Sequence, residues 1–197
     1  TMPRSPNPPP LDPDHRHAAW LARHQTAVRR QFVEHDIPAY FDYARRFTLC
    51  DHYFTDVAGP STPNHLMLVT ADSPVVDNPP HHGAGGPKFA LTSLPRSLEK
   101  HGLTWGNYGG YVFGLIKELQ GRPQFTSQQF AVDAKAGKLP SVSWVYAPHD
   151  ASEHAPDPGD RNDPRVGNVT HGMQWTVDQV NATVHGDGLT SLQFRRT

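Results

Sequence analysis

The chain has 197 residues, enough for one domain or most of one, and 36% of them are hydrophobic. Its formal net charge is −1, so no basic excess points to nucleic acid as a partner. No apolar run approaches the roughly 18 residues of a membrane-spanning helix, which favours a soluble chain with no integral membrane segment. The single cysteine, Cys50, excludes an internal disulfide.

Proline and glycine punctuate the chain. The 20 prolines and 16 glycines predict many turns and long connections. They gather at residues 1–13, 73–87 and 156–167. We expect residues 1–13 to form a proline-rich arm. The stretches between these clusters are expected to be ordered.

Helical patterns dominate the first third of the chain. Four apolar residues recur there at near-helical spacing: Trp20, Leu21, Val28 and Phe32. This spacing predicts an amphipathic helix over residues 15–35. A second, aromatic-rich helix is predicted over 39–47, after Pro38 in its first turn. Residues 48–57 are expected to form a strand or an extended run, and a third helix is predicted over 63–71.

Helices and strands alternate in the remainder. We expect helices over residues 94–101, 112–119, 125–136 and 169–184, strands over 103–108 and 141–146, and polar connections over 73–87 and 147–167. Gly102 and Gly137 are placed to cap the helices that precede them. This alternation of short strands and helices predicts a layered α/β fold.

The segment around Ser61 is the most informative. Gly59 and Pro60 end the extended run, Ser61 or Thr62 can cap the following helix, and Pro63 suits its first turn. A hydroxyl at a helix N-terminus faces unpaired backbone N–H groups and the positive end of the helix dipole, which favour phosphate. The dipole contributes only about 0.3–1 kcal/mol when exposed, so a base or metal ion must supply the remaining activation. By pattern alone, a simple helix cap is the commoner role.

A family resemblance adds to this pattern. The string C-D-H-Y-F…G-P-S-T-P-N-H resembles a segment of bacterial phospholipases C and related acid phosphatases. In that family the third residue of a G-x-[ST]-x-x-N turn attacks phosphorus. The resemblance implies that Ser61 is the nucleophile and a metal ligand, and that Asn64 contacts the phosphate. Thr62 is a rival nucleophile, one residue out of register.

Other stretches agree with the same family. DIPAYFDYARRFTLCD is similar to its helix before the nucleophile, and Gln179-Val180-Asn181-Ala182 resembles a later helix. KLPSVSWVYAPHDASEHAP resembles a stretch whose histidine lies near the phosphate, and His154 occupies that position. The resemblance implies that His154 binds a phosphate oxygen or protonates the leaving alcohol. Without it, a surface loop histidine would be the simpler interpretation.

The resemblance also implies a fold and a cofactor. The family is alkaline-phosphatase-like, so residues 14–197 would be a partial phosphoesterase domain, an α/β/α sandwich incomplete at both ends. A divalent metal ion of unknown identity would lie beside the nucleophile. Its usual ligands, an early Glu-Asn pair and a late Asp-Asp or Asp-Glu pair, are missing, because Glu34 is followed by His35 and the last residues carry no such pair. We therefore expect little or no activity from this polypeptide alone.

The leading hypothesis is phosphate ester hydrolysis through a covalent phosphoserine, with metal assistance in the complete enzyme. Phospholipid diesters are favoured over monoesters as substrates, and the resemblance implies a secreted or periplasmic protein. The alternative is an inactive fragment or remnant of the same fold with a binding or structural role.

Two other clusters could suggest metal binding. His81 and His82 lie near Asp77, and acidic residues recur between 150 and 163. Neither cluster matches the ligand spacing of a known site, so both are predicted to be solvated loops.

Overall fold

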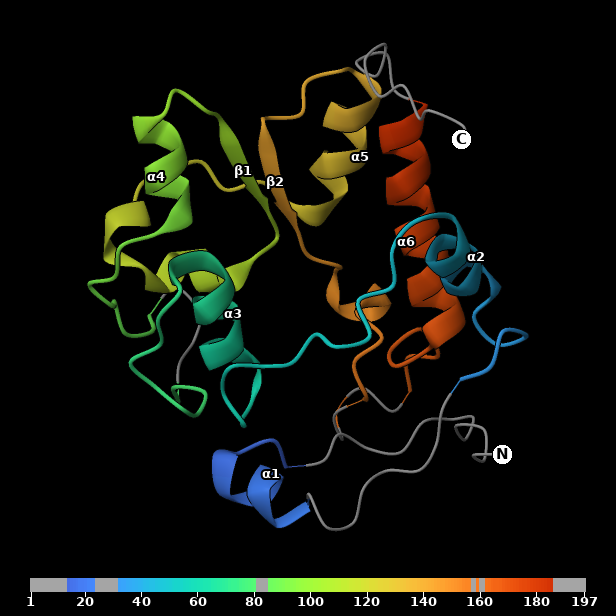
Figure 1. Cartoon of the computed structure of the whole chain (residues 1–197), viewed down its shortest axis with the longest axis horizontal. Coiled ribbons are helices and arrows are strands. Elements are labelled where there is room, and N and C mark those ends of the chain that lie inside the picture. Colours follow the sequence, from blue (N-terminus) through green and yellow to red (C-terminus); the bar gives the residue numbers. More distant parts are fainter. Residues whose placement is uncertain (1–13, 24–31, 81–84, 157–158, 160–161, 186–197) are drawn as a thin grey trace.

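The computed structural model of the protein describes residues 14–23, 32–80, 85–156, 159 and 162–185 (Figure 1). The arm expected over residues 1–13 lies outside them. The α-helices are α1 (His17–Arg23), α2 (Pro38–Arg46), α3 (Ser61–Thr70), α4 (Leu94–Lys100), α5 (Ser127–Lys135) and α6 (Val169–Val184). The strands are β1 (Trp105–Tyr108) and β2 (Val142–Val145), and short 3-10 helices are η1 (Tyr111–Leu115), η2 (Lys117–Leu119) and η3 (His149–Ala151).

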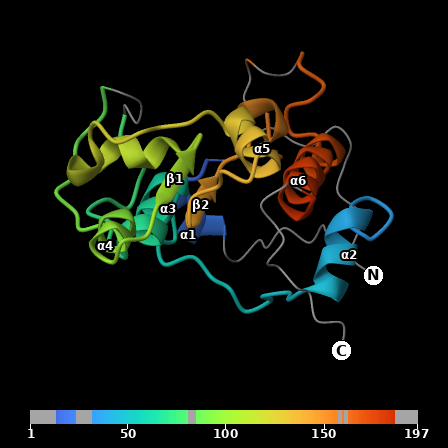
Figure 2. The same ribbon diagram turned by 90° about the horizontal axis from the view of Figure 1, so that it is seen from above.

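The two strands form a parallel pair. Trp105 lies opposite Val142 and Tyr108 opposite Val145, and α5 belongs to the connection between the strands. The pair lies between α4 on one side and α5 on the other (Figures 1 and 2). The mixed α/β fold predicted from the sequence is therefore confirmed.

Most of the predicted second-half elements are also confirmed. Helices α4, α5 and α6 and both strands lie within one to two residues of their expected bounds. Gly102 has a φ of +71°, and the Leu103 N–H donates to the Leu98 carbonyl at 3.0 Å, which closes the end of α4. Gly137, with a φ of +65°, follows α5 in the same conformation.

The apolar core lies between α3 and the segment that follows β1. Its members are almost entirely excluded from solvent: Leu66, Val69, Val112, Phe113, Leu115, Ile116 and Leu119. Burial of such side chains stabilises the fold by about 25 cal/mol per Å² of apolar surface. The core therefore anchors α3, the helix that begins at Ser61.

The helix predicted over residues 112–119 is wrong, because this segment forms η1 and η2 instead. The Phe89 N–H donates to the Leu115 carbonyl at 2.7 Å, and the Lys117 N–H donates to the Phe89 carbonyl at 2.8 Å. These backbone groups pair with a neighbouring segment, so they cannot make the hydrogen bonds that a continuous α-helix requires. Apolar periodicity could not reveal this competition.

The helix predicted over residues 15–35 is also wrong at its C-terminal end. Helix α1 ends at Arg23, and residues 34–36 form a turn; residues 24–31 lie outside the described part. In the turn, the Asp36 N–H donates to the Val33 carbonyl at 2.8 Å, and the Val33 N–H donates to the Asp36 carboxylate at 3.1 Å. This closed turn ends just before Pro38 begins α2.

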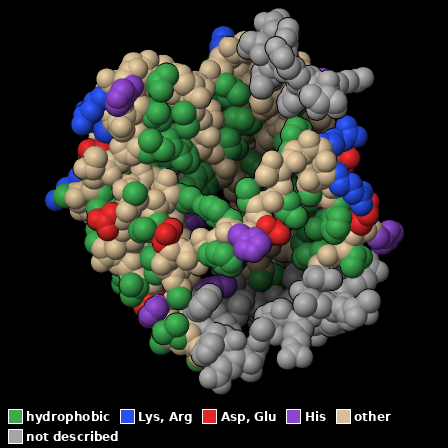
Figure 3. All heavy atoms as spheres, in the orientation of Figure 1, with side chains coloured by type: hydrophobic (Ala, Val, Ile, Leu, Met, Phe, Trp, Pro, Cys, Tyr) green, Lys and Arg blue, Asp and Glu red, His purple; other side chains and the backbone are tan. Residues whose placement is uncertain are grey.

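Residues 48–57 form no strand, contrary to one of the two expectations for this run. The run connects α2 to α3 and leaves large apolar side chains in solvent: Leu49 is 68% exposed, Tyr53 70% and Phe54 77%. Figure 3 shows further hydrophobic side chains along a hollow between the half of the molecule that carries α4 and the half that carries α6.

Within the described ranges, no helix combines the length and apolarity needed to cross a bilayer.

Helix α3 begins earlier than predicted, so neither Ser61 nor Thr62 is its N-cap. Pro60 occupies the N-cap position and has no side-chain acceptor. The cap is supplied instead by a distant loop, because the Thr62 N–H donates to the Asn78 side-chain oxygen at 2.9 Å. Pro63 has no N–H, so the first turn offers fewer free donors than the sequence suggested.

Replacement of Asn78 tests this cap. We expect Asn78→Ala to lower the free energy of unfolding by about 1 kcal/mol, because it leaves the Thr62 N–H without its acceptor. Asn78→Asp keeps an acceptor and places a negative charge near a helix N-terminus, so it should be close to neutral. Urea denaturation of both variants measures the difference. If Asn78→Ala and Asn78→Asp had the same free energy of unfolding, the assignment of Asn78 as the cap would be contradicted.

Candidate active site

The turn before Ser61 is held by the side chain of Asn64. The Val57 N–H donates to the Asn64 oxygen at 3.0 Å, and the Asn64 amide nitrogen donates to the carbonyls of Val57 at 2.9 Å and Pro60 at 3.1 Å. Gly59 is needed in this turn because a Cβ there would lie 2.5 Å from the Val76 carbonyl oxygen. The predicted phosphate contact of Asn64 stays a prediction; here both of its amide hydrogens are directed to the backbone.

The two candidate hydroxyls differ in accessibility. Thr62 is 0% exposed, and its hydroxyl lies 3.0 Å from that of Tyr111. Ser61 is exposed, and its hydroxyl lies 3.4 Å from the same Tyr111 oxygen. Molecules in solution can therefore reach Ser61 but not Thr62. This difference supports Ser61 over its rival.

An imidazole lies one helical turn after Ser61. The His65 ring stacks on Tyr146 with ring centroids 5.1 Å apart and lies 5.6 Å from the Tyr111 ring. Its Nδ1 is hydrogen-bonded to the Tyr146 hydroxyl at 3.0 Å. Burial lowers the pKa of His65 below its ordinary value and raises the pKa of Tyr146 to about 12, so both groups are neutral near pH 7.

The tyrosines reach this cluster from the carboxyl ends of the parallel strands. Tyr111 follows β1 by three residues, and Tyr146 directly follows β2. The Asn107 side chain fixes the first of these turns through bonds to the Gly110 N–H at 2.9 Å and carbonyl at 2.7 Å. A Cβ at Gly110 would lie 2.5 Å from a ring carbon of Tyr146. Ligand sites of open α/β sheets lie at this end of the strands.

His154 lies in the loop that follows β2 and η3. Its ring is exposed, its Nδ1 is bonded to the Ala155 carbonyl at 2.8 Å, and its centroid lies 6.1 Å from that of His15. His17 lies two residues after His15, and its ring is hydrogen-bonded to the carbonyl of Ala58, in the turn before Ser61. The start of the described chain thus links the His154 loop to the Ser61 turn.

Sequence reasoning missed several members of this cluster, namely His15, His17, His65, Tyr111 and Tyr146. The signal for His65 was available, because residues four apart share a face of a helix. The tyrosines could have been suggested by their places after the two predicted strands. The two early histidines carried no local signal.

The described residues do not by themselves form a metal-binding site. Among the described residues, no three His, Cys, Asp or Glu side chains gather into a possible ligand set. Asp77 accepts the His17 N–H at 2.7 Å, while His81 and His82 lie outside the described part. In the acidic loop, Asp150 pairs with Arg165 at 2.6 Å. Ser61, the residue predicted to be a metal ligand, lies among the described residues.

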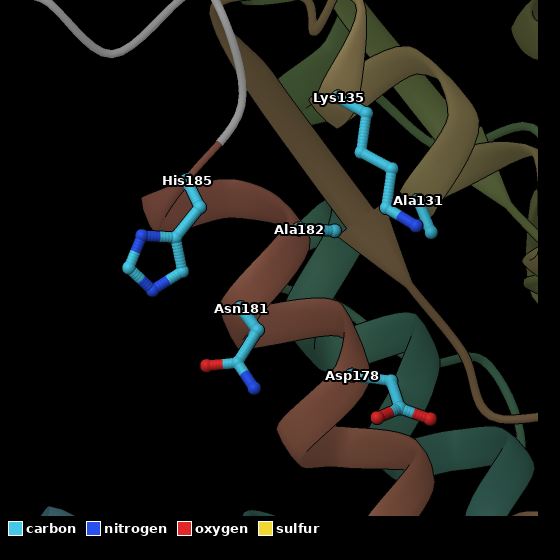
Figure 4. A pocket seen from close by; sticks show the side chains of 6 residues that line it. All are labelled: Ala131, Lys135, Asp178, Asn181, Ala182 and His185. Atoms are coloured by element: carbon cyan, nitrogen blue, oxygen red, sulfur yellow. The ribbon is translucent and has the colours of Figure 1, made fainter.

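A separate groove of about 510 Å³ lies between α5 and α6 (Figure 4). It is lined by Ala131, Lys135, Asp178, Asn181, Ala182 and His185. Figure 4 shows Lys135 at the end of α5, Asp178 and Asn181 on the last turns of α6, and His185 directly after α6. None of the residues predicted to act on phosphate lines it, so it is distinct from the Ser61 cluster.

Comparison with known proteins identifies the family. The model of the phosphoesterase family matches residues 13–184, which is most of the chain. The chain belongs to the phosphoesterase family. The matched range includes the Ser61 turn, both strands, the His154 loop and α6.

Several phosphoesterase relatives are named as phospholipases C. The chain is 30% identical to the non-hemolytic phospholipase C of Pseudomonas aeruginosa over 68% of this chain and 23% of the relative. It is 26% identical to phospholipase C B of Mycobacterium tuberculosis over 62% of this chain and 29% of the relative. For the non-specific phospholipase C4 of Arabidopsis thaliana, the identity is 28% over 59% of this chain and 23% of the relative. The chain therefore spans about a quarter of the length of the curated relatives it matches.

The hydrogen bonds of Asn64 predict a structural effect of its replacement. Asn64→Ala removes three bonds to one turn, so we expect the free energy of unfolding to fall by about 2 kcal/mol. Asn64→Asp should also destabilise, because a carboxylate cannot donate to the two carbonyls. The exposed Asn181→Ala serves as a control that should stay within about 0.5 kcal/mol of the parent. Native stability of Asn64→Ala in urea would rule out the assigned role.

The buried imidazole predicts a pH effect. His65 has a folded-state pKa below its unfolded value, so acid favours the unfolded chain, and the His65 contribution to stability falls as the pH drops through about 6.5. His65→Gln removes this titration while keeping polar groups beside Tyr146. We expect the loss of unfolding free energy between pH of about 7.5 and about 5 to be smaller in His65→Gln than in the parent. Parallel urea titrations at the two pH values measure it, and identical pH dependence would refute the assignment.

Proposed function

We propose that this chain carries the nucleophile region of a phosphate ester hydrolase that forms a covalent phosphoserine at Ser61. The observation that carries the proposal is the exposed Ser61 hydroxyl at the start of α3, beside a buried Thr62. The phosphoesterase family match and the phospholipase C relatives support hydrolysis of phosphate esters. The names of these relatives favour a phospholipid diester as the substrate.

The proposed first step is an in-line displacement at phosphorus. The bond from Ser61 Oγ to phosphorus forms while the bond from phosphorus to the substrate alcohol oxygen breaks. The Ser61 proton leaves to a base, and the alcohol oxygen takes up a proton, for which His154 is the proposed donor. Water then cleaves the phosphoserine, which releases the phosphate-containing product and restores the serine hydroxyl.

The described residues supply orientation for this step. Tyr111 lies within 3.4 Å of the Ser61 hydroxyl and within 3.0 Å of that of Thr62, so it fixes both against the helix start. A tyrosine hydroxyl is a poor base, so Tyr111 does not activate the serine alone. The positive end of the α3 helix dipole stabilises a bound anion by at most about 2 kcal/mol.

A divalent metal ion belongs to the proposal for the complete enzyme. Such an ion lowers the pKa of a bound hydroxyl and neutralises phosphate charge. Ser61 would be one ligand, and the others would come from residues outside the described set, because that set forms no group of three candidate ligands. The alkaline-phosphatase-like α/β/α sandwich and export from the bacterial cell are further parts of the proposal that rest on the resemblance.

An activated phosphorus reagent tests Ser61 without a metal. Paraoxon is a neutral triester whose p-nitrophenolate leaves without a proton, so labelling needs an accessible hydroxyl and a base that takes the serine proton, which hydroxide supplies in an alkaline buffer. We expect it to place one diethylphosphoryl group on Ser61, detected by mass spectrometry of the digested chain. We expect steady-state hydrolysis of phosphodiesters by these residues alone to be slow even with added divalent metal.

Matched variants identify the reactive hydroxyl. Labelling should disappear in Ser61→Ala and persist in Thr62→Val, which keeps the shape of the buried residue. Labelling of Thr62, or of a tyrosine in place of Ser61, would overturn the proposed nucleophile. Unlabelled parent chain would favour the remnant with a binding or structural role.

A further inference from the structure

The residue before His154 has an unusual backbone conformation. Glu153 has a φ of +59°, in the left-handed region that side chains other than glycine seldom adopt. Ala71 is the other such residue in the described part, and it ends α3, where this conformation is common. Glu153 directly follows Ser152, the residue that caps the end of η3, so it too lies just after a helix end. A residue other than glycine keeps this conformation where surrounding contacts stabilise it.

One of these contacts comes from α2. The Tyr40 hydroxyl donates a hydrogen bond to the Glu153 carboxylate at 2.5 Å, and it lies 3.2 Å from the Thr176 hydroxyl of α6. A bond from a neutral donor to a carboxylate is shorter and stronger than one between neutral groups. Burial and the bond to Glu153 raise the pKa of Tyr40 to about 12, so the phenol keeps the proton that it donates.

A second contact is made possible by a glycine inside α6. A Cβ at Gly172 would lie 2.2 Å from the Glu153 Cγ and 2.8 Å from the Ala151 carbonyl oxygen. Glycine within a helix lowers its stability, so this position needs a reason. The reason here is space, because the Glu153 side chain packs directly against the helix backbone at Gly172.

The fixed residue determines how the next one is presented. The His154 N–H donates to the Ser152 hydroxyl at 3.3 Å, and the ring is bonded to the adjacent Ala155 carbonyl, so His154 is bonded within its own loop. Glu153, the residue before it, is held by contacts from two distant elements, α2 and α6. A change in the Glu153 backbone would therefore redirect the His154 side chain.

We propose that Tyr40, Glu153 and Gly172 form a latch that positions His154 toward the phosphate site. Tyr40 and Gly172 are 132 residues apart, so the latch also fastens α2, which precedes the nucleophile turn, to the loop that follows β2. The inference rests on the proposed function, in which His154 acts on phosphate or on the leaving alcohol. The three latch residues are positioning residues and take no part in the chemistry.

The test uses NMR of the full chain with isotope-labelled histidine. The His154 signals are identified as those that disappear in His154→Gln. Tyr40→Phe removes only the donor, and Gly172→Ala closes the slot. We expect both variants to shift the His154 ring and amide signals and to speed hydrogen exchange of its N–H by about tenfold. Glu153→Gln keeps an acceptor oxygen for the Tyr40 hydroxyl, so its spectrum should be nearly that of the parent.

Tyr43→Phe is the matched control, because it removes a second hydroxyl from α2 at a position outside the latch. Unchanged His154 signals in Tyr40→Phe would overturn the latch, even if the variant loses stability, and so would equal shifts in Tyr43→Phe. The paraoxon experiment separates the two proposals. Shifted His154 signals with an unlabelled Ser61 would uphold the latch and defeat the proposed function.

Discussion

The Asn64 side chain binds three backbone groups of the turn before α3, and the presentation of Ser61 depends on that turn. Because the turn is closed at Pro60, the helix starts at Ser61. Successive helical residues are rotated by about 100° from each other, so burial of Thr62 directs Ser61 outward. The choice between two adjacent hydroxyls thus follows from the position at which one helix begins.

The second organising constraint is the parallel strand pair. Both strands end at the same edge, and each is followed within a few residues by a tyrosine that packs on His65. The core beneath this edge holds α3 through Leu66 and Val69, so the helix, the tyrosines and the strands form one rigid support. Rigid elements hold reacting groups more precisely than isolated loops do.

Membership of the phosphoesterase family gives this arrangement a chemical context, while the site as described has orientation without charge neutralisation. Hydroxyls, a neutral imidazole and aromatic rings surround Ser61, and no group of three candidate metal ligands occurs among the described residues. The chain spans about a quarter of the length of its curated relatives. What the described residues show is an exposed serine hydroxyl at the start of a helix that the core holds in place.

The sequence by itself determined the elements that depend on local patterns. Apolar periodicity gave α6 and α5, alternation gave both strands, and the glycines after α4 and α5 marked helix ends, because each signal lies within a few residues of its effect. The motif around Ser61 gave the family by resemblance. Only the tertiary structure decided that Asn78 caps α3 and that Leu115 and Lys117 pair with Phe89 in place of forming an α-helix. It also decided that His17, His65, Tyr111 and Tyr146 gather near the Ser61 turn. The reason is physical: hydrogen bonds and ring contacts between segments tens of residues apart leave no periodic trace in either segment.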